Sequence, residues 1–399
     1  MTIVQAHIDA LGPLLFRDAR PFTSDADETR ARSLESPLPS TVAGLCRTVI
    51  GDALGWAWQD GVAVDNARLI HLKAHWLVRS QGGRRTAVTV CPSTALPYRD
   101  EGDGSPDVLR LEPEPLKPDE GCDLPHQELR PMVPRGEVKP WPGFRWWSWA
   151  DLEAWLRGET RLPTEMDGPV ADERVQIELD PESDTVKEGR LFTTEYRSWE
   201  DIDRSAERGG QLVRWSLEAR LDVPSDWSVD ALSGPHVAHF GGERRPVAVT
   251  LSVEPTRGAD RDDVAPGLSL TQALSGSLEG QRHVAAYLVT PGLFDGGWRP
   301  GWLGEGTPPH PALRGARLVG AAVPRREPVS GWDFAQGRRG PKATRWLVPA
   351  GAVFFLELDH GLTPADLREL WLTSLCDRPT DRDDGFGLAV WGLGNGEGN

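Results

Sequence analysis

The sequence is poor in cysteine and tyrosine, with 4 and 3 of them in a chain of 399 residues. The cysteines lie far apart and form no Cys-x-x-Cys pair, which excludes the usual zinc and dithiol redox motifs. No apolar run approaches the roughly 18–20 residues that span a bilayer, and the first residues lack the basic and apolar regions of a signal peptide. We therefore expect a cytoplasmic protein with free thiols and no membrane partner.

Several short motifs of enzymes are also missing. There is no Gly-x-Gly-x-x-Gly or Walker A loop for a nucleotide, and no Gly-x-Ser-x-Gly elbow for a nucleophilic serine. Asp381, Asp383 and Asp384 resemble a fragment of a calcium loop, but the downstream acid is absent, so a solvated turn is favoured. The sequence thus predicts no metal site and no cofactor.

Negative charge is in excess, with 60 acidic against 44 basic side chains and a net charge of −16. Taken globally, this argues against a protein that coats nucleic acid by bulk charge. The charge is unevenly spread, because residues 99–128 and 165–188 each carry a net charge of −7, whereas residues 314–345 carry +6. Charged blocks are usually solvated faces, but the basic block is also a candidate nucleic-acid contact.

Periodicity predicts an α+β protein. Apolar side chains alternate over residues 4–10, as in a half-buried strand, and recur at helical spacing over residues 42–54. Ser40 or Thr41 is the expected N-cap of that helix. A β-hairpin at residues 70–91 then completes the first half of a ferredoxin-like unit.

The rest of the chain is expected to be rich in strands. They are predicted at residues 213–221, 247–253, 284–289, 316–323, 352–358 and 386–393, with a helix starting at Thr363-Pro364. We expect two related domains, residues 1–210 and 211–399, whose boundary lies near 195–235. Residues 97–142 contain ten prolines and predict a long irregular insertion in the first domain, ending at a helix capped by Ser148.

Three arginine-rich loops point to RNA. The segment 331–345 combines two aromatic rings, four cations and permissive glycines: Trp332, Phe334, Gly337, Arg338, Arg339, Gly340, Lys342 and Arg345. Cations bind phosphates and flat rings stack on unpaired bases, which is the chemistry of single-stranded RNA recognition. Residues 241–245 and 16–22 have a similar character. Together these loops favour a binder of structured or single-stranded RNA over a merely charged hairpin tip.

The histidines leave an alternative open. His7, His71 and His75 lie on polar faces of expected strands, where one of them is either a general base for RNA cleavage or an ordinary surface histidine. His236 and His239 are three apart on an expected strand, so they should point to opposite faces. That arrangement is poor geometry for a metal site.

Tryptophan is abundant, with 17 residues, and core packing explains most of them best. Trp146, Trp147 and Trp149 cluster beside the proline-rich insertion. They are also a candidate partner surface.

Ordered motifs spread over residues 16–392 resemble one known family. They are FRDARPF at 16–22, PLPSTVAG at 37–44 with Arg47, GRLF at 189–192, HVAHFGGERR at 236–245, GWD at 331–333, GPKATR at 340–345 and PAGAVFF at 349–355. Each motif is weak alone, but their order along the chain is specific. On these residues the chain resembles the RAMP-superfamily subunit of Cmr (type III-B) CRISPR effector complexes that holds the 5′ handle of the guide RNA.

The resemblance implies two ferredoxin-like, RRM-like RAMP domains and no catalytic residues. It also implies partners: the guide RNA, the large polymerase/cyclase-like subunit and a backbone RAMP subunit of an antiviral complex. The cations that it assigns to RNA are Arg17, Arg20, Arg47, Arg244, Arg245, Arg338, Arg339, Lys342 and Arg345.

Further RNA contacts are expected beside these cations. Phe22, Trp332 and Phe334 would stack on exposed bases, and the helix N-terminus at Ser40 and Thr41 would receive a phosphate. Backbone groups of the glycine loop around Gly337 and Gly340 would read base edges.

Two other functions are kept open. One is a RAMP endoribonuclease that processes precursor guide RNA with a histidine as general base, such as His7 or His239. The other is a structural adaptor with no RNA contact. Cleavage of repeat RNA distinguishes the first, and the absence of RNA crosslinks in residues 331–345 distinguishes the second.

Overall fold

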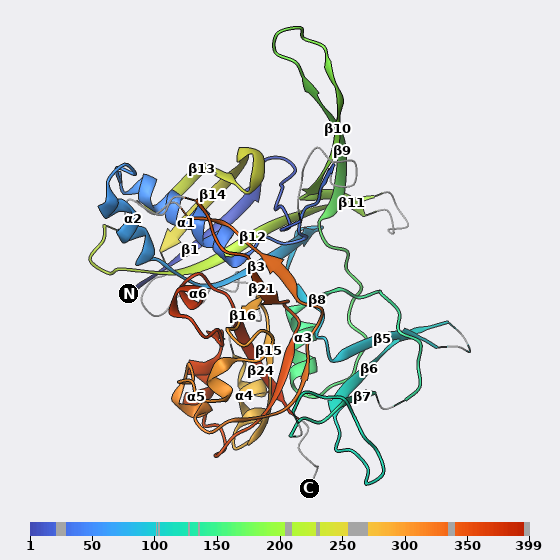
Figure 1. The fold of residues 1–399 in the computed structure, drawn as a ribbon. Helices are drawn as coiled ribbons and strands as arrows, with labels where there is room; N and C mark the ends of the chain where they lie inside the picture. The colour runs from blue at the N-terminus through green and yellow to red at the C-terminus, as the bar shows by residue number, and fades with distance from the viewer. Residues whose placement is uncertain are drawn as a thin grey trace. The chain divides into compact units, whose positions relative to one another are not determined.

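The computed structural model describes residues 1–20, 29–100, 102, 104–126, 128–134, 136–203, 210–228, 232–253, 270–333 and 340–394, without the side chains of 187–190 and 332–333. The chain forms two compact units, each built from three segments (Figure 1). Unit 1 contains Met1–Arg85, Gly168–Gly258 and Pro328–Arg345, and unit 2 contains Thr86–Asp167, Ala259–Glu327 and Trp346–Asn399. The expected mixture of helices and strands is confirmed, whereas two ferredoxin-like domains divided at residue 210 stay a prediction.

The elements of unit 1 are β1 (Thr2–Ala10), β2 (Arg30–Ala31), α1 (Pro39–Ala53), α2 (Gly61–Arg68), β3 (His71–Gln81), β9 (Val170–Leu179), β10 (Val186–Ser198), β11 (Glu200–Asp203), β12 (Gln211–Val223), β13 (Gly234–Phe240), the 3-10 turn η2 (Gly242–Arg244), β14 (Arg245–Val253), β19 (Trp332–Asp333) and β20 (Gly340–Pro341). The strand β4 (Arg84–Val90) runs from unit 1 into unit 2.

The main sheet of unit 1 is antiparallel and has the strand order β13-β14-β1-β12-β3. One face carries the buried side chains of β1 (Val4, Ala6, Ile8), paired with Leu221, Ala219 and Leu217 of β12. The helix α1 contacts β3 and β13 and buries Val42, Leu45, Cys46, Val49 and Ile50. The period-2 and period-3.6 patterns of the sequence therefore identified this sheet and its helix correctly.

The start of α1 differs from its prediction. Leu38 is the N-cap, and no side chain caps the helix, so the expected cap at Ser40 or Thr41 is wrong. Pro39 occupies the first helical position, where its fixed φ favours a helix and its missing N–H costs nothing. Proline thus sets the start of the helix one residue before the hydroxyl side chains.

The elements of unit 2 are β5 (Ala95–Arg99), β6 (Pro106–Pro113), β7 (Met132–Pro134), β8 (Trp146–Ser148), α3 (Trp149–Leu156), α4 (Gln272–Leu278), β15 (His283–Leu288), β16 (Gly292–Leu293), η3 (Gly301–Leu303), η4 (Pro311–Leu313), β17 (Arg317–Ala322), β22 (Val353–Glu357), α5 (Pro364–Leu370), β23 (Thr373–Ser374), α6 (Pro379–Asp383) and β24 (Leu388–Leu393). Two further strands, β18 (Glu327–Val329) and β21 (Arg345–Val348), lie at the unit boundary. The main sheet of unit 2 has the strand order β17-β22-β15-β24-β23.

The proline-rich insertion is more regular than predicted. Within residues 97–142, β6 pairs with both β5 and β7 in a small antiparallel sheet. Pro106, Pro113 and Pro134 stand at strand ends, where a missing N–H donor is tolerated. Pro97 lies inside β5, which is an edge strand of this sheet, where proline is also tolerated. The prediction of a wholly irregular excursion is therefore wrong.

The tryptophan cluster at the end of this insertion belongs to the core. Trp146, Trp147 and Trp149 are all buried, and the indole N–H of Trp147 donates to the carbonyl of Phe144 at 2.8 Å. The rings of Trp147 and Trp155 meet edge to face with centroids 5.4 Å apart. Core packing is confirmed for these residues, and the alternative of a partner surface is wrong.

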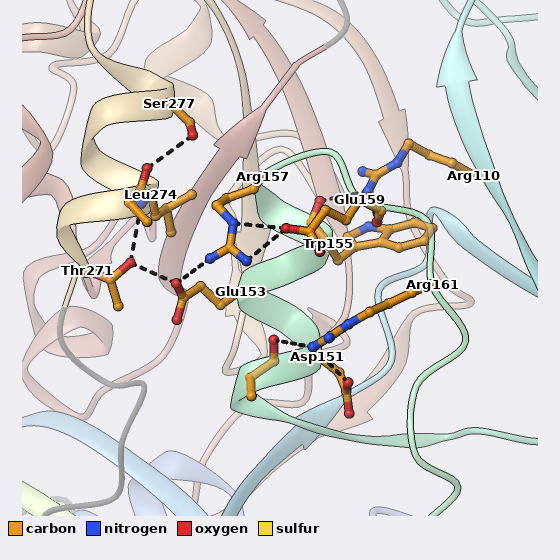
Figure 2. A network of polar contacts seen from close by, with 12 residues as sticks. Arg110, Asp151, Glu153, Trp155, Arg157, Glu159, Arg161, Thr271, Leu274 and Ser277 are labelled. Carbon is orange, nitrogen blue, oxygen red and sulfur yellow. Dashed lines mark hydrogen bonds and ion pairs between the residues drawn. The ribbon is translucent and has the colours of Figure 1, made fainter.

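A polar network joins α3 to the start of α4 within unit 2 (Figure 2). The Glu153 carboxylate accepts hydrogen bonds from Arg157 at 2.6 Å and from the Thr271 hydroxyl at 2.7 Å. The same Thr271 oxygen caps α4 by accepting from the amide of Leu274 at 3.2 Å. One hydroxyl thus satisfies a free helix N–H and ties two helices that are 118 positions apart in sequence.

Replacing Thr271 with valine should lower the free energy of unfolding by about 1–2 kcal/mol, since it removes both the helix cap and the bond to Glu153 while keeping the shape. Thr271→Ser retains the oxygen and should cost far less. Urea unfolding followed by circular dichroism measures both variants. Equal stability of the valine variant and the native chain would contradict a role for this hydroxyl.

Candidate functional site

Segments far apart in the sequence meet at the turn between β13 and β14, which contains Gly241, Gly242, Glu243 and Arg244. The amide of Gly242 donates to the carbonyl of Leu15 at 2.7 Å. Residue Leu14 in turn exchanges backbone hydrogen bonds of 2.9 and 2.8 Å with Arg197 of β10. Two of the sequence motifs, at residues 16–22 and 236–245, are therefore brought to neighbouring positions in unit 1 beside the inner end of β10.

The close approach of the turn requires glycine. Gly241 has φ +74°, and a Cβ atom there would lie 2.4 Å from the Leu15 carbonyl oxygen and 3.0 Å from the Phe16 ring. Glu243 and Arg244 follow with φ of 55° and 52°, in the left-handed region that non-glycine residues rarely adopt. Such backbone strain persists only where the surrounding contacts hold it.

Those contacts come from Tyr196. Its hydroxyl donates to the Glu243 carboxylate at 2.6 Å and accepts from the Gln176 amide at 2.8 Å. Arg245 donates to the same Glu243 oxygen at 3.0 Å, and its guanidinium lies 4.3 Å from the centre of the Tyr196 ring. The carboxylate of Glu243 is thus occupied inside the site, where it positions Arg245 against the tyrosine.

Aromatic packing fixes the other side of the turn. The buried Phe16 ring meets Phe240 edge to face at 4.9 Å and Trp199 at 6.5 Å between centroids. The amide of Phe16 donates to the Ser33 hydroxyl at 3.0 Å. The first residue of the 16–22 motif, Phe16, is therefore fixed in the core, and the next residue, Arg17, is at the surface.

The predicted cations near this turn differ in their availability. Arg244 is exposed, and among the described residues no hydrogen bond or ion pair engages its side chain. Arg17 is exposed and donates to the carbonyl of Arg20 at 3.2 Å, while Arg20 pairs with Asp18 at 3.3 Å. Arg244 is thus the cation best placed to meet an external anion.

Arg47 lies elsewhere in unit 1, on α1. Its guanidinium donates twice to the carbonyl of Ile70, at 3.1 and 2.9 Å. This is the geometry of a structural link between α1 and the start of β3. Ser40 and Thr41 are half-buried in the first turn of the same helix.

The glycine-rich segment forms a short hairpin. β19 pairs with β20, and the amide of Lys342 donates to the carbonyl of Gly331 at 2.8 Å. Lys342 is exposed, and Arg345 is half-buried at the end of the hairpin. Five predicted contacts, Phe22, Phe334, Gly337, Arg338 and Arg339, lie outside the described residues, as does the side chain of Trp332.

Sequence reasoning missed the residues that hold the turn. Tyr196, Gln176 and Glu243 were not predicted, although Glu243 stands inside the GGERR motif. Their roles depend on a contact between positions 47 apart in the chain. The position of Glu243 between a glycine pair and two arginines could have indicated that it binds one of them. No feature of the sequence around Tyr196 indicated its role.

Two of the candidate histidines, His7 and His75, lie in environments that do not suit a general base. Hydrogen bonds to Asp9 and Glu218 raise the pKa of His7 to about 9, and burial lowers the pKa of His75 to about 4. His7 is therefore a cation at neutral pH, which is unsuitable for a general base. His236 pairs with buried Val249 and His239 with Pro246, so they point to opposite faces as predicted.

Within the residues that the structure describes, no three His, Cys, Asp or Glu side chains gather as metal ligands. In that same part of the chain, no helix is long and apolar enough to cross a membrane.

Comparison with known families identifies the chain. Residues 6–393 match the family described as CRISPR-associated protein (Cas_Cmr3). The chain belongs to this family. The resemblance to a Cmr subunit, drawn from the ordered motifs, is confirmed at this level.

Solved structures give more distant matches to this Cas_Cmr3 family member. Chains in cryo-EM structures of the Type III-B Cmr-beta bound to cognate target RNA, with and without AMPPnP, are 15% identical to it, and each match covers 88% of this chain and 86% of the other. Their TM-scores are 0.42 and 0.43. None of the curated proteins matches the chain.

Gly241→Ala should lower the free energy of unfolding by about 2–3 kcal/mol, because it places a Cβ against the Leu15 carbonyl in a strained backbone conformation. Gly44→Ala, in α1 with open space around it, is the matched control and should be neutral or slightly stabilising. Urea unfolding measures both. A Gly241 variant as stable as the Gly44 variant would show that the turn tolerates a side chain.

The pKa of His7 predicts a pH-dependent stability. Because it is raised to about 9 from its usual 6.5, the ion pairs of His7 stabilise fully below pH 6.5 and lose their effect as pH rises through 9. His7→Gln should cost about 1 kcal/mol at pH 6, after allowance for a side chain that is 34% exposed, and nothing above pH 10.

Chemical unfolding across pH 6–10 measures this difference. His239→Gln, at an exposed position, is the control and should follow the native profile. A constant gap between the His7 variant and the native chain at every pH would refute the assignment.

Proposed function

We propose that this Cas_Cmr3 family member is a non-catalytic subunit of a type III-B CRISPR effector complex that binds the repeat-derived 5′ handle of the guide RNA. The observation that carries the proposal is that two family-like motifs, at residues 16–22 and 236–245, meet at one strained turn where Arg244 is exposed. Backbone strain kept at an exposed basic turn favours binding over structure alone.

The chemistry of the turn fits an RNA backbone. Arg244 and Arg17 are both exposed, and each follows by two residues a partner of the bond between Gly242 and Leu15. Guanidinium groups bind phosphate oxygens in a bidentate manner, and they retain their charge at all physiological pH values. Glu243 faces Tyr196 and Arg245, which leaves Arg244 without a competing carboxylate among the described residues.

The hairpin containing Gly331 and Lys342 supplies a second set of contacts. Lys342 is exposed beside the backbone bond that closes the hairpin. Arg338 and Arg339 would add phosphate contacts, and Trp332, Phe334 and Phe22 would stack on bases, each worth about 1–3 kcal/mol. Handle specificity would come from base edges read by backbone groups of Gly337 and Gly340.

A binding role without cleavage is supported by the surroundings of His7. The cation His7 is held between Asp9 and Glu218, at 3.1 and 3.6 Å, and is not available as a base near neutral pH. We propose further that the chain bridges the large polymerase/cyclase-like subunit to the first backbone RAMP subunit, as the family resemblance implies.

Charge reversal at Arg338, Arg339 and Lys342 should weaken retention of guide RNA in the assembled complex by tenfold or more, and Arg244→Ala should weaken it by about three- to tenfold. Loss of phosphate contacts should also flatten the dependence of binding on salt, by about 0.7 in log–log slope for each contact to a single strand. Filter binding of complexes programmed with labelled guide RNA measures both quantities.

The control is Arg68→Ala, an exposed arginine of α2 in the same unit, which should leave RNA retention unchanged. Guides with a scrambled handle of equal length test specificity. Unchanged retention by all the loop and turn variants, with no RNA crosslink in residues 331–345, would identify a structural adaptor instead.

A further inference from the structure

The strands β9 and β10 form a long two-stranded ribbon in unit 1. They pair antiparallel, while β2 joins β10 over only two residue pairs, Thr193 with Arg30 and Thr194 with Ala31. Beyond this point the ribbon extends away from the other strands of unit 1 (Figure 1). Because an isolated two-stranded ribbon is only marginally stable in water, the outer half of this ribbon is a candidate interaction surface.

One face of the outer ribbon is apolar and exposed. Cross-strand pairing puts Ile177 beside Leu191 and Leu179 beside Val186 on this face, with Val175 two residues before Ile177. The side chains are 48%, 60%, 53%, 55% and 68% exposed for Ile177, Leu191, Leu179, Val186 and Val175. Five aliphatic side chains in one exposed stripe are a feature of interaction surfaces.

The opposite face is already used. Gln176 and Tyr196 lie there and hold the turn at Glu243. Arg174 also lies on that face, 5.2 Å from the centre of the Tyr196 ring. The ribbon thus has one face engaged inside its unit and one face exposed.

Negative charge is concentrated at the end of the exposed stripe. The ribbon ends in a turn that carries Asp180, Glu182 and Asp184, whereas Glu173, on the same face as the stripe, pairs with Arg30. The turn is ordered by hydrogen bonds from the amides of Glu182 and Asp184 to Asp180, both 2.9 Å long. A preformed turn lowers the entropic cost of binding.

We infer that the face formed by Val175, Ile177, Leu179, Val186 and Leu191, here called the ribbon stripe, docks a protein partner whose apolar patch is bordered by lysine or arginine. The acidic tip repels phosphate, which disfavours RNA, and complements basic side chains. The inference rests on the part of the proposed function that places the chain in a multisubunit complex, and it is independent of handle binding.

Binding of the purified chain to each companion subunit of its complex, presented singly, tests the inference, with single-stranded guide RNA as the second probe. Ile177→Thr with Leu191→Thr keeps good strand formers and should weaken binding to one protein partner by about tenfold. Asp180→Asn, Glu182→Gln and Asp184→Asn together should weaken it by about threefold at low salt and have no effect at high salt. RNA binding should not change.

The matched control is Asp119→Asn, Glu120→Gln and Asp123→Asn, which removes as many exposed acids from unit 2. It should bind partners as the native chain does, and circular dichroism checks that all variants are folded. Native affinity of the stripe variant for every companion subunit overturns the inference, and so does a loss confined to RNA. Handle binding is tested with other variants, at Arg244 and in residues 331–345, so a failure of that proposal is distinguished from a failure of this one.

Discussion

The hydrogen bond from the Gly242 amide to the Leu15 carbonyl is the contact on which the candidate site depends. Leu15 is buried, so its carbonyl needs a partner, and the turn supplies one at 2.7 Å. That approach leaves no room for a side chain at Gly241. The chain on either side, Phe16 with Arg17 and Glu243 with Arg244, is consequently held in one place despite more than 220 intervening residues.

Acidic side chains define which arginines remain available. Glu243 binds Arg245 and Asp18 binds Arg20. Arg47 is likewise engaged, by the backbone carbonyl of Ile70, so these three cations make contacts within the protein. Arg244 differs because the carboxylate that precedes it is bound to Tyr196 and Arg245, while its own side chain is exposed. A net charge of −16 is therefore compatible with an anion-binding surface, since binding responds to local potential.

The ribbon of β9 and β10 connects two surfaces of unit 1. On one face Tyr196 and Gln176 position the basic turn, and on the other the ribbon stripe is exposed beside an acidic tip. The alternation of side chains along a strand separates these chemistries by a single residue step. The proposed RNA contact and the proposed protein contact thus use the same two strands without sharing side chains.

Local patterns in the sequence determined the elements. Alternation predicted β1, β12 and β14, helical spacing predicted α1, and the capping signals at Ser148 and Thr363 predicted α3 and α5, because these features depend on neighbouring residues. Local rules were wrong where two of them competed. Pro39 displaced the hydroxyl cap of α1, and prolines at strand ends and in an edge strand allowed a sheet in residues 97–142.

The ordered motifs also determined the family, since their succession along the chain is a property of sequence alone. Only the tertiary structure decided which residues hold the candidate site. Tyr196 and Glu243 are 47 positions apart, and no periodicity signals that a hydroxyl and a carboxylate will meet at 2.6 Å. The backbone bonds of Leu14 with Arg197 and of Leu15 with Gly242 bring these segments together, and Arg245 is then held against Tyr196 while Arg244 is exposed to solvent.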